Sequence, residues 1–414
     1  MTRPSAVSMK RQFSPWLLAA VLLPLPAAQA AELTGRLSML GSTAKAEQGD
    51  IGYIDADNKT LTADQQSFRL MLDDVHDNGE WSVHLKTRRQ HLSGYPVNEL
   101  NSSGLFRYRE LSHDWLDERD SNSATRVGYE LDRALYKHRF DNITLGIGRQ
   151  PIDWGTGRFW QPLNVFGAFA PTDLDTDFKP GIDAAVLDWY PSAFSSVTAV
   201  YAFAPDDNTT IDDSGAFHYR RQVGERSELT LLAGRVIGDD VMGAAFESEW
   251  SGLGWRIEGV HYNLKQTDES ALFWIAGIDY QFNDGTLIAA EWYDNNHGVT
   301  DEASLVVTQS DRLVSYGLQP HLGRRVLGIS VQRDITPLLN GNYMMLSSAL
   351  KDADNHLSAS MLHQFNLVYS VSNESDLLLS LLYANGKGMT PMAEPQSEFG
   401  HTPTSMTVRL RFYF

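Results

Sequence analysis

Charged side chains recur at every second position in several segments of the chain, a spacing that can build charged surfaces. A basic set contains Arg36, Arg69, His84, Lys86, Arg88, Arg409 and Arg411. An acidic set contains Glu247, Glu249, Glu258, Asp279 and Glu291, with Arg256 as a basic exception among them. Such groups bind and orient ions and dipolar solutes through their charge. The first chemistry to consider is therefore electrostatic.

Covalent and metal chemistry have weaker support. The sequence contains no Gly-x-Ser-x-Gly elbow and no His-Glu-x-x-His helix, so we do not expect an enzyme. Asp173, Asp175 and Asp177 resemble the start of a calcium loop, but Phe178 and Ala184 stand where such a loop has its glycine and glutamate. We expect neither a metal nor a cofactor.

The elements that carry the two charged sets are predicted to be β-strands. Apolar residues alternate with polar ones in segments of about ten residues, many with an aromatic residue at one end. Clear examples are residues 33–39, 68–72, 81–85, 143–147, 197–203, 274–282 and 365–369. Such segments with aromatic ends are typical of transmembrane barrels, and short turns alternate with long loops here as in those barrels.

The loops fix the expected strand number. Long connections are expected at 42–66, 91–125, 151–181, 295–323 and 386–402, and even closure requires Leu313 to Gln319 to lie in a loop. The result is an all-β, antiparallel, up-and-down transmembrane barrel of about eighteen strands with long extracellular loops. If the weaker segments 215–223 and 241–250 are not strands, sixteen remain.

The last ten residues, SMTVRLRFYF, indicate how the barrel closes. Val408, Leu410, Phe412 and Phe414 share one face of this strand, and Arg409 and Arg411 share the other. In hydrocarbon every backbone polar group must be paired within the protein, so we expect the last strand to pair with the first. The apolar face then contacts lipid, and both charged sets line the lumen on opposite sides. A soluble β-sandwich or propeller also alternates, but would leave this strand as an exposed edge.

The first thirty residues have the order of a secretory signal peptide. Arg3, Lys10 and Arg11 precede a short apolar run, and Ala28-Gln29-Ala30 follows, so cleavage is expected near Ala30. Residues 31–414 would form a single barrel domain. Removal of the signal peptide changes the formal charge from −18 to −21, because residues 1–30 contain three basic residues and no acidic one. Nucleic acid is therefore not an expected partner. The exported chain has no cysteine, so disulfides cannot stabilise it.

The aromatic stretch from Gly148 to Gly181 is the candidate constriction. It contains Arg149, Asp153, Trp154, Arg158 and Trp160 among glycines and prolines. So many aromatic residues are expected to pack, either inside the lumen or against the rim, and we favour the lumen. Rings in a channel can stack on sugars, although rim packing would explain the same residues.

Two resemblances follow from these motifs. The terminal strand resembles the end of Gram-negative outer-membrane barrels, in which the final Phe, here Phe414, is recognised by the barrel assembly machinery. The Gly-Arg-Gln and Trp-Gly-x-Gly segments, with RALYKHRF and DITPLLNG, resemble the porin-like group that includes alginate-export-type barrels. An alginate exporter is expected to have a lumen dominated by arginine, whereas carboxylates share the lining here.

Together these patterns predict an outer-membrane porin, in contact with lipid and lipopolysaccharide, that passes small hydrophilic solutes, anionic ones included. A carbohydrate-specific barrel and a plugged structural or adhesive barrel remain open alternatives. A barrel of sixteen to eighteen strands is wide enough to leave an aqueous channel.

Overall fold

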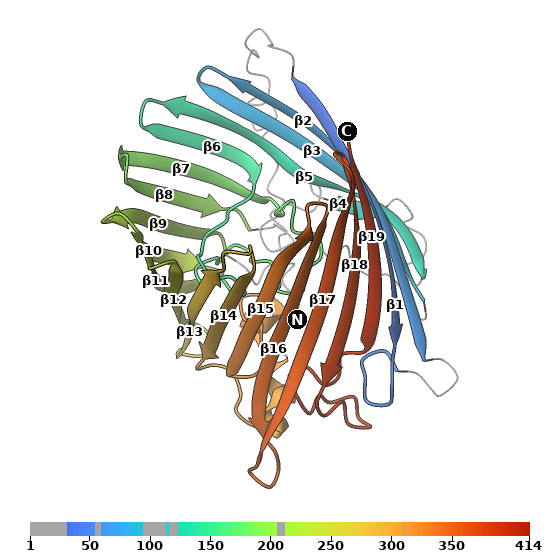
Figure 1. Cartoon of the computed structure of the whole chain (residues 1–414). Coiled ribbons are helices and arrows are strands. Elements are labelled where there is room, and N and C mark those ends of the chain that lie inside the picture. Colours follow the sequence, from blue (N-terminus) through green and yellow to red (C-terminus); the bar gives the residue numbers. More distant parts are fainter. Residues whose placement is uncertain (1–30, 54–58, 94–112, 116–122, 205–211, 310) are drawn as a thin grey trace, which may run out of the picture.

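The computed structural model describes residues 31–53, 59–93, 113–115, 123–204, 212–309 and 311–414. The strands along this part of the chain are β1 (Glu32–Lys45), β2 (Thr60–His76), β3 (Gly79–Leu92), β4 (His113–Trp115), β5 (Thr125–Phe140), β6 (Ile143–Gln150), β7 (Ile182–Ser192), β8 (Ser195–Ala202), β9 (Ser214–Val223), β10 (Ser227–Val236), β11 (Asp239–Trp250), β12 (Leu253–Leu264), β13 (Glu269–Gln281), β14 (Leu287–Asn295), β15 (Arg325–Thr336), β16 (Leu339–Lys351), β17 (Leu357–Ser372), β18 (Ser375–Asn385) and β19 (Thr404–Tyr413). Every strand except the three-residue β4, which lies beside β5, belongs to one closed antiparallel ring (Figure 1).

The ring has the eighteen strands that even closure requires. The two weak segments form β9 and β11, and residues 313–319 lie in the connection between β14 and β15. The expected loop 42–66 is shorter than predicted, because β1 continues to Lys45 and β2 begins at Thr60. The predicted leader, residues 1–30, lies outside the described residues.

The last strand closes the ring against the first, as expected. Leu410 pairs with Met39 in the β19–β1 ladder, and the Gly35 amide donates to the Phe414 carbonyl over 2.8 Å. The Phe414 ring stacks on Phe68 with 5.9 Å between ring centroids. It also covers Gly35 so closely that a Cβ there would lie 2.2 Å from the ring. A side chain at position 35 would therefore displace the terminal aromatic residue.

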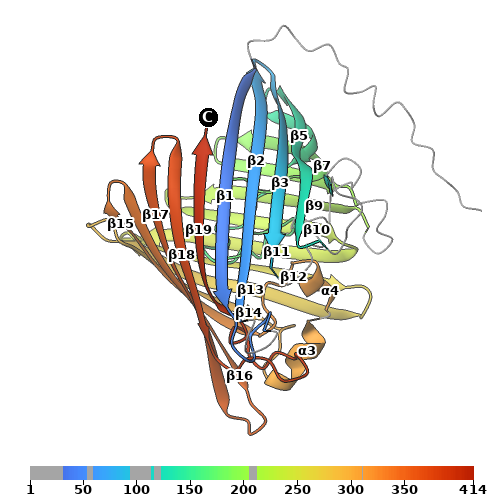
Figure 2. The same cartoon turned by 90° about the vertical axis from the view of Figure 1, so that its right-hand side faces the viewer.

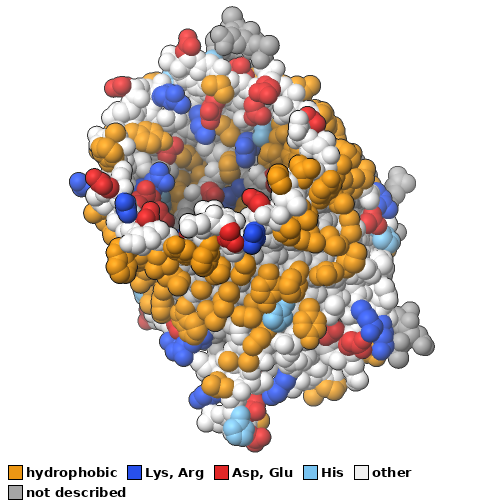
Figure 3. All heavy atoms as spheres, in the orientation of Figure 1, with side chains coloured by type: hydrophobic (Ala, Val, Ile, Leu, Met, Phe, Trp, Pro, Cys, Tyr) orange, Lys and Arg blue, Asp and Glu red, His pale blue; other side chains and the backbone are white. Residues whose placement is uncertain are grey.

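The outer surface of the ring is apolar. Phe68, Leu70, Val408 and Phe412 are exposed, and hydrophobic side chains form a broad belt below the mouth of the barrel in Figure 3. The opposite phase of the same strands points inward and includes Arg69, which is 3% exposed. The alternation thus has the polarity expected of a barrel in lipid.

The strands differ strongly in length around the ring. β2 has 17 residues and β17 has 16, whereas β6 and β8 have only 8. Figures 1 and 2 show the long strands β1–β3 on the opposite side of the ring from the shorter β8–β10. The connection from β6 to β7 runs through the interior of the ring (Figure 1).

Three short helical segments occupy the β14–β15 connection: η2 (Glu302–Ser304), α3 (Leu305–Thr308) and α4 (Arg312–Ser315). Asp301 and Asp311 accept hydrogen bonds from backbone amides at the starts of η2 and α4. None of the helices in the described part of the chain has the length and apolar character needed to cross a membrane.

Candidate functional site: an inner loop held between two charged walls

The candidate site is the segment 151–181, here called the inner loop, which crosses the lumen between two sets of inward-facing charges. The acidic wall comprises Glu247, Glu249, Glu258, Asp279 and Glu291 on β11–β14. The basic wall comprises Arg36, Arg69, His84, Lys86, Arg88, Arg409 and Arg411 on β1, β2, β3 and β19. All twelve were predicted to face the lumen, and the structure places them on the inner phase of their strands. The inner loop contacts both walls.

The front half of the inner loop binds the acidic wall through its backbone. The Glu258 carboxylate accepts hydrogen bonds from the amides of Thr156 (2.5 Å) and Leu163 (2.7 Å). The Glu291 carboxylate accepts from three further amides, those of residues 158, 159 and 160, at 2.9, 3.1 and 3.0 Å. Both glutamates are 1% exposed. Two buried carboxylates thus replace the strand partners that this irregular backbone lacks.

The remaining acidic residues are less tightly engaged. Asp279 forms an ion pair with Arg256 and lies 3.3 Å from the guanidinium of Arg158. Glu249, near the β11–β12 turn, lies 3.4 Å from Arg226. Arg256, the basic exception in the sequence pattern, is therefore a partner of the wall on which it lies.

The rear half of the inner loop binds the basic wall through side chains. Arg36 holds Asp175 in a bidentate pair, with nitrogen-to-oxygen distances of 2.7 and 2.8 Å, and also lies 2.8 Å from Asp177. Asp177 in turn accepts from Arg411 (2.5 Å) and from the Tyr413 hydroxyl (2.6 Å). The acidic run that resembled a calcium loop therefore supplies counter-charges for arginines.

Packing strengthens this contact. The guanidinium carbons of Arg36 and Arg69 lie 4.9 and 4.3 Å from the centroid of the Phe178 ring, within cation–π range. Arg409 donates to the backbone carbonyl of Leu174. The segment from Leu174 to Phe178 is thus held by charge, backbone and ring contacts together.

The rest of the basic wall is also largely neutralised. Arg69 pairs with Asp132, Arg88 lies 3.1 Å from Glu130, and His84 lies 3.0 Å from Asp73. Asp376 on β18 accepts from Arg411 at 2.9 Å. Lys86 forms no hydrogen bond or ion pair with any described residue.

The carboxyl groups of the acidic run differ in pKa. Burial would raise the pKa of Asp175, but the hydrogen bonds and charge of Arg36 outweigh it and lower that pKa. The pKa of Asp177 is lowered in the same way, as burial is outweighed by the Tyr413 hydroxyl and the charge of Arg411. The pKa of Asp173 is instead raised, by burial and by the neighbouring charge of Asp175. Asp173 therefore lies outside the group that the arginines stabilise.

The predicted loop residues have different positions. Arg149 lies on β6 rather than in the inner loop, where it pairs with Asp183 of β7 at 2.5 Å and fixes the base of the loop. Asp153 pairs with Lys179, and Trp154 stacks on His218 with 4.7 Å between ring centroids. Trp160 is 3% exposed and donates its indole N–H to His321.

His321 connects three loops. Its Nε2 accepts from Trp160 over 2.8 Å, which leaves the proton on Nδ1 to be donated to Glu398 over 3.0 Å. Glu398 also accepts from the Gly323 amide over 2.7 Å. Burial would raise the pKa of Glu398, but the hydrogen bonds that it accepts from His321 and from the Gly323 and Leu322 amides outweigh burial and lower that pKa. The inner loop is thus joined to the β14–β15 and β18–β19 connections.

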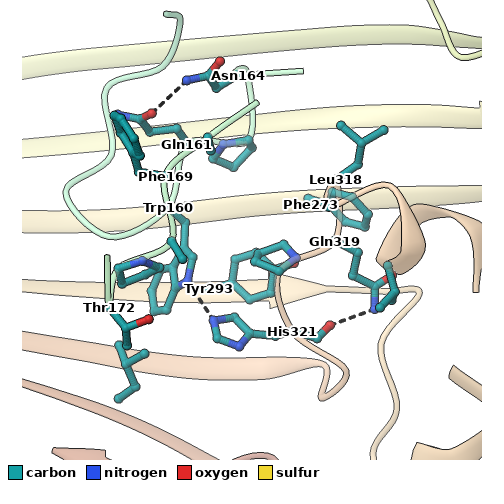
Figure 4. A pocket seen from close by; sticks show the side chains of 18 of the residues that line it. Trp160, Gln161, Asn164, Phe169, Thr172, Phe273, Tyr293, Leu318, Gln319 and His321 are labelled. Atoms are coloured by element: carbon teal, nitrogen blue, oxygen red, sulfur yellow. Dashed lines mark hydrogen bonds between the residues drawn. The ribbon is translucent and has the colours of Figure 1, made fainter. Parts of the chain in front are cut away.

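A cavity of about 600 Å³ lies among these three loops. Figure 4 shows Gln161, Asn164, Phe169 and Trp160 on one side of it and Leu318, Phe273 and Gln319 on the other, with Tyr293 and His321 between them. Asp173 and Glu398 also line it, and none of its described lining residues is Lys or Arg. The inner loop therefore forms one wall of a solute-sized space.

Several residues that hold the site together were not predicted from the sequence. Glu130 and Asp132, both on β5, are the partners of Arg88 on the adjacent β3 and of Arg69 on β2, one strand further away, and inward alternation in β5 could have revealed them. His321 and Glu398 lie in separate long loops, where no periodic pattern indicates a contact.

Comparison with known proteins supports the fold. The sequence matches no family model and no curated protein. The structure is similar to Acinetobacter baumannii OccAB1 (TM-score 0.57, 10% identity, covering 92% of this chain and 96% of that one). It is similar to Pseudomonas aeruginosa OccK2 (OpdF; 0.57, 11%, 92% and 98%) and OccD3 (OpdP; 0.56, 9%, 93% and 91%). At identities this low, the structural similarity shows only that the barrel fold is shared, and it extends over nearly the whole of this chain.

Proposed function

We propose that this barrel is an outer-membrane channel through which small hydrophilic solutes diffuse, with the inner loop as its constriction. The observation that carries the proposal is the closed eighteen-strand ring with an apolar exterior and a charged interior. The solved barrels that share this architecture are Gram-negative outer-membrane porins, which supports the same role here. Figure 3 shows a hollow with Lys, Arg, Asp and Glu side chains inside its mouth.

The constriction lies where the inner loop crosses the lumen and contacts both walls. The arginines and glutamates of the walls orient the loop and, where they remain accessible, the passing solute. Lys86 is the basic-wall residue that forms no hydrogen bond or ion pair in the described part of the chain, and its charge favours anions near the loop. Transport in this proposal is passive and involves no covalent step.

The same proposal includes the membrane partners. Lipid and lipopolysaccharide cover the apolar belt, and the long loops face outward from the cell. The 63%-exposed ring of Phe414 serves as the recognition point for the barrel assembly machinery. Replacing Phe414 with Ala is expected to reduce the amount of folded barrel in outer membranes, which immunoblots of separated membranes measure. An unchanged amount would contradict this role.

Planar-bilayer recording of the purified mature protein tests the channel. Discrete ion-conducting steps are expected, because the lumen is polar and the ring is closed. A plugged structural or adhesive barrel would give a seal indistinguishable from lipid alone. Protein reconstituted into liposomes provides a second test of the channel. A small neutral solute is expected to leave these liposomes, and a large dextran is expected to be retained.

A further inference from the structure

We propose that the cavity beside Trp160 and Phe169 binds a neutral, hydroxyl-bearing ring, such as a monosaccharide, before it passes the constriction. This inference rests on the proposed channel function and specifies the solute class. The cavity volume of about 600 Å³ lies within the range of roughly 300 to 1,000 Å³ common for small-molecule sites. It is built from three loops that the Trp160–His321–Glu398 hydrogen bonds hold together.

The charges at the cavity disfavour anions. Asp173 and Glu398 are lining residues, and the cavity has no Lys or Arg among the described residues that line it. Lys179 lies 5.9 Å from the Phe169 centroid, but it is paired with Asp153. A carboxylate-bearing ligand would meet two carboxylates with no counter-charge, so uronates fit this cavity poorly.

The polar groups require a ligand that both donates and accepts hydrogen bonds. One oxygen of Asp173 accepts from the Ala170 amide, and its other oxygen is engaged by no described residue. The Gln161 side-chain oxygen accepts from Asn164 over 2.9 Å, which leaves its amide N–H₂ as a donor. Hydroxyl groups satisfy a free carboxylate oxygen and a free amide donor together, whereas an ammonium group satisfies only the first.

The rings supply the apolar surface. Trp160, Phe273, Tyr293 and Phe399 are buried and form the rigid part of the lining, while Phe169 remains half-buried at the cavity. The C–H face of a sugar ring packs on such an aromatic surface while its hydroxyls point outward to polar groups. Shape, charge and hydrogen-bonding capacity therefore agree on one class of ligand.

Single-channel recording in the presence of sugars tests the proposal. Glucose is expected to produce brief, saturable interruptions of the current, whereas glucuronate at equal concentration produces few. Cyclohexylamine, which carries an ammonium group but no hydroxyl, should interrupt the current no more strongly than glucose. If glucuronate matches glucose, or cyclohexylamine blocks far more strongly, the cavity has a different preference and the proposal is overturned.

Two variants locate the site. Phe169→Leu keeps the apolar volume and removes the ring, and should weaken glucose binding about fivefold. The matched control Phe282→Leu, on the exposed outer face, should not change it. Equal blocking in wild type and Phe169→Leu would place the sugar elsewhere.

The two proposals fail in different ways. A barrel that conducts normally but shows no glucose-dependent interruption refutes the sugar site alone. A barrel that never conducts refutes the channel function. Asp173→Asn, which keeps an oxygen for the Ala170 amide, should increase glucuronate blocking relative to glucose; an unchanged ratio would remove Asp173 from the site.

Discussion

The two walls hold the same loop by different chemistry. On the acidic wall, Glu258 and Glu291 accept hydrogen bonds from main-chain amides of the front half, so the wall recognises the backbone. On the basic wall, Arg36 and Arg411 bind the side chains of Asp175 and Asp177 in the rear half. The front contact therefore fixes the shape of the loop, whereas the rear contact also fixes the charge that remains in the lumen.

This difference predicts a division of roles. Weakening the front contact should alter the width of the channel, because the loop loses its conformation. Weakening the rear contact should alter ion preference, because arginines lose their counter-charges.

The largest effect is expected for the double variant Glu258→Gln and Glu291→Gln. Each hydrogen bond to a charged group contributes about 1.5 to 3 kcal/mol, and an amide presents only one acceptor oxygen where the carboxylate presents two. The front half should detach from the wall, and single-channel conductance should rise severalfold. Glu249→Gln is the matched control on the same wall, since Glu249 contacts no inner-loop residue in the structure. Equal conductance in the double variant and the control would show that the loop is held by other contacts.

The next effect is expected for Asp175→Asn with Asp177→Asn. Arg36 and Arg411 would keep hydrogen-bond acceptors but lose opposing charges, so the lumen becomes more positive. Reversal potentials in a KCl gradient should shift toward chloride preference, with a much smaller change in conductance than in the glutamate variant. Asp354→Asn, in the exposed β16–β17 connection, should leave the potential unchanged. A shift toward potassium would contradict the neutralising role of the two aspartates.

The two contacts differ in how well the sequence predicts them. Period-two alternation places every wall residue on the inner phase, because lipid outside and water inside impose opposite preferences on successive side chains. Closure followed from the apolar face of Val408, Leu410 and Phe412 together with the need to pair all backbone groups in lipid. These parts of the fold were predictable because they follow from local periodicity and solvent.

The loop contacts were not predictable in the same way. Glu291 binds amides, which every residue except proline carries, so no side-chain pattern in the loop identifies its partner. The acidic run at 173–177 is evident in the sequence and resembles a calcium loop. Nothing in its spacing indicates that it contacts arginines. His321 and Glu398 meet only because the ring closes and brings distant loops together. Such contacts depend on tertiary geometry rather than on spacing.

The third prediction concerns pH and the rear contact. A carboxyl group whose pKa is lowered in the folded protein contributes stability that is fully present above the unfolded value, near 3.9 for Asp, and is lost as pH falls through the lowered value. Because the pKa values of Asp175 and Asp177 are both lowered, the rear contact should persist through mildly acidic pH and weaken only below about pH 4.

Ion selectivity recorded as a function of pH measures this transition. The raised pKa of Asp173 places its titration at higher pH than that of its neighbours, so Asp173→Asn should remove any earlier step and leave the acidic one. Selectivity could instead be lost at a pH above the usual carboxyl range, both in the wild type and in Asp173→Asn. That outcome would show that the arginines do not stabilise the ionised forms of Asp175 and Asp177.

The smallest effect is expected for Trp160→Phe, which keeps a ring and removes the donor to His321. A neutral hydrogen bond contributes about 0.5 to 1.5 kcal/mol, less than the charged contacts on either wall. The amide of residue 160 still binds Glu291, so mean conductance should change little while open-channel noise increases as the loop moves against the β14–β15 connection. Trp250→Phe, which alters a 75%-exposed ring on the outer face, should leave the noise unchanged. If Trp160→Phe raised conductance as much as the double glutamate variant, the loop would be fixed by the Trp160 side chain. The contrast between a wall that binds backbone and a wall that binds side chains would then no longer explain how the constriction is held.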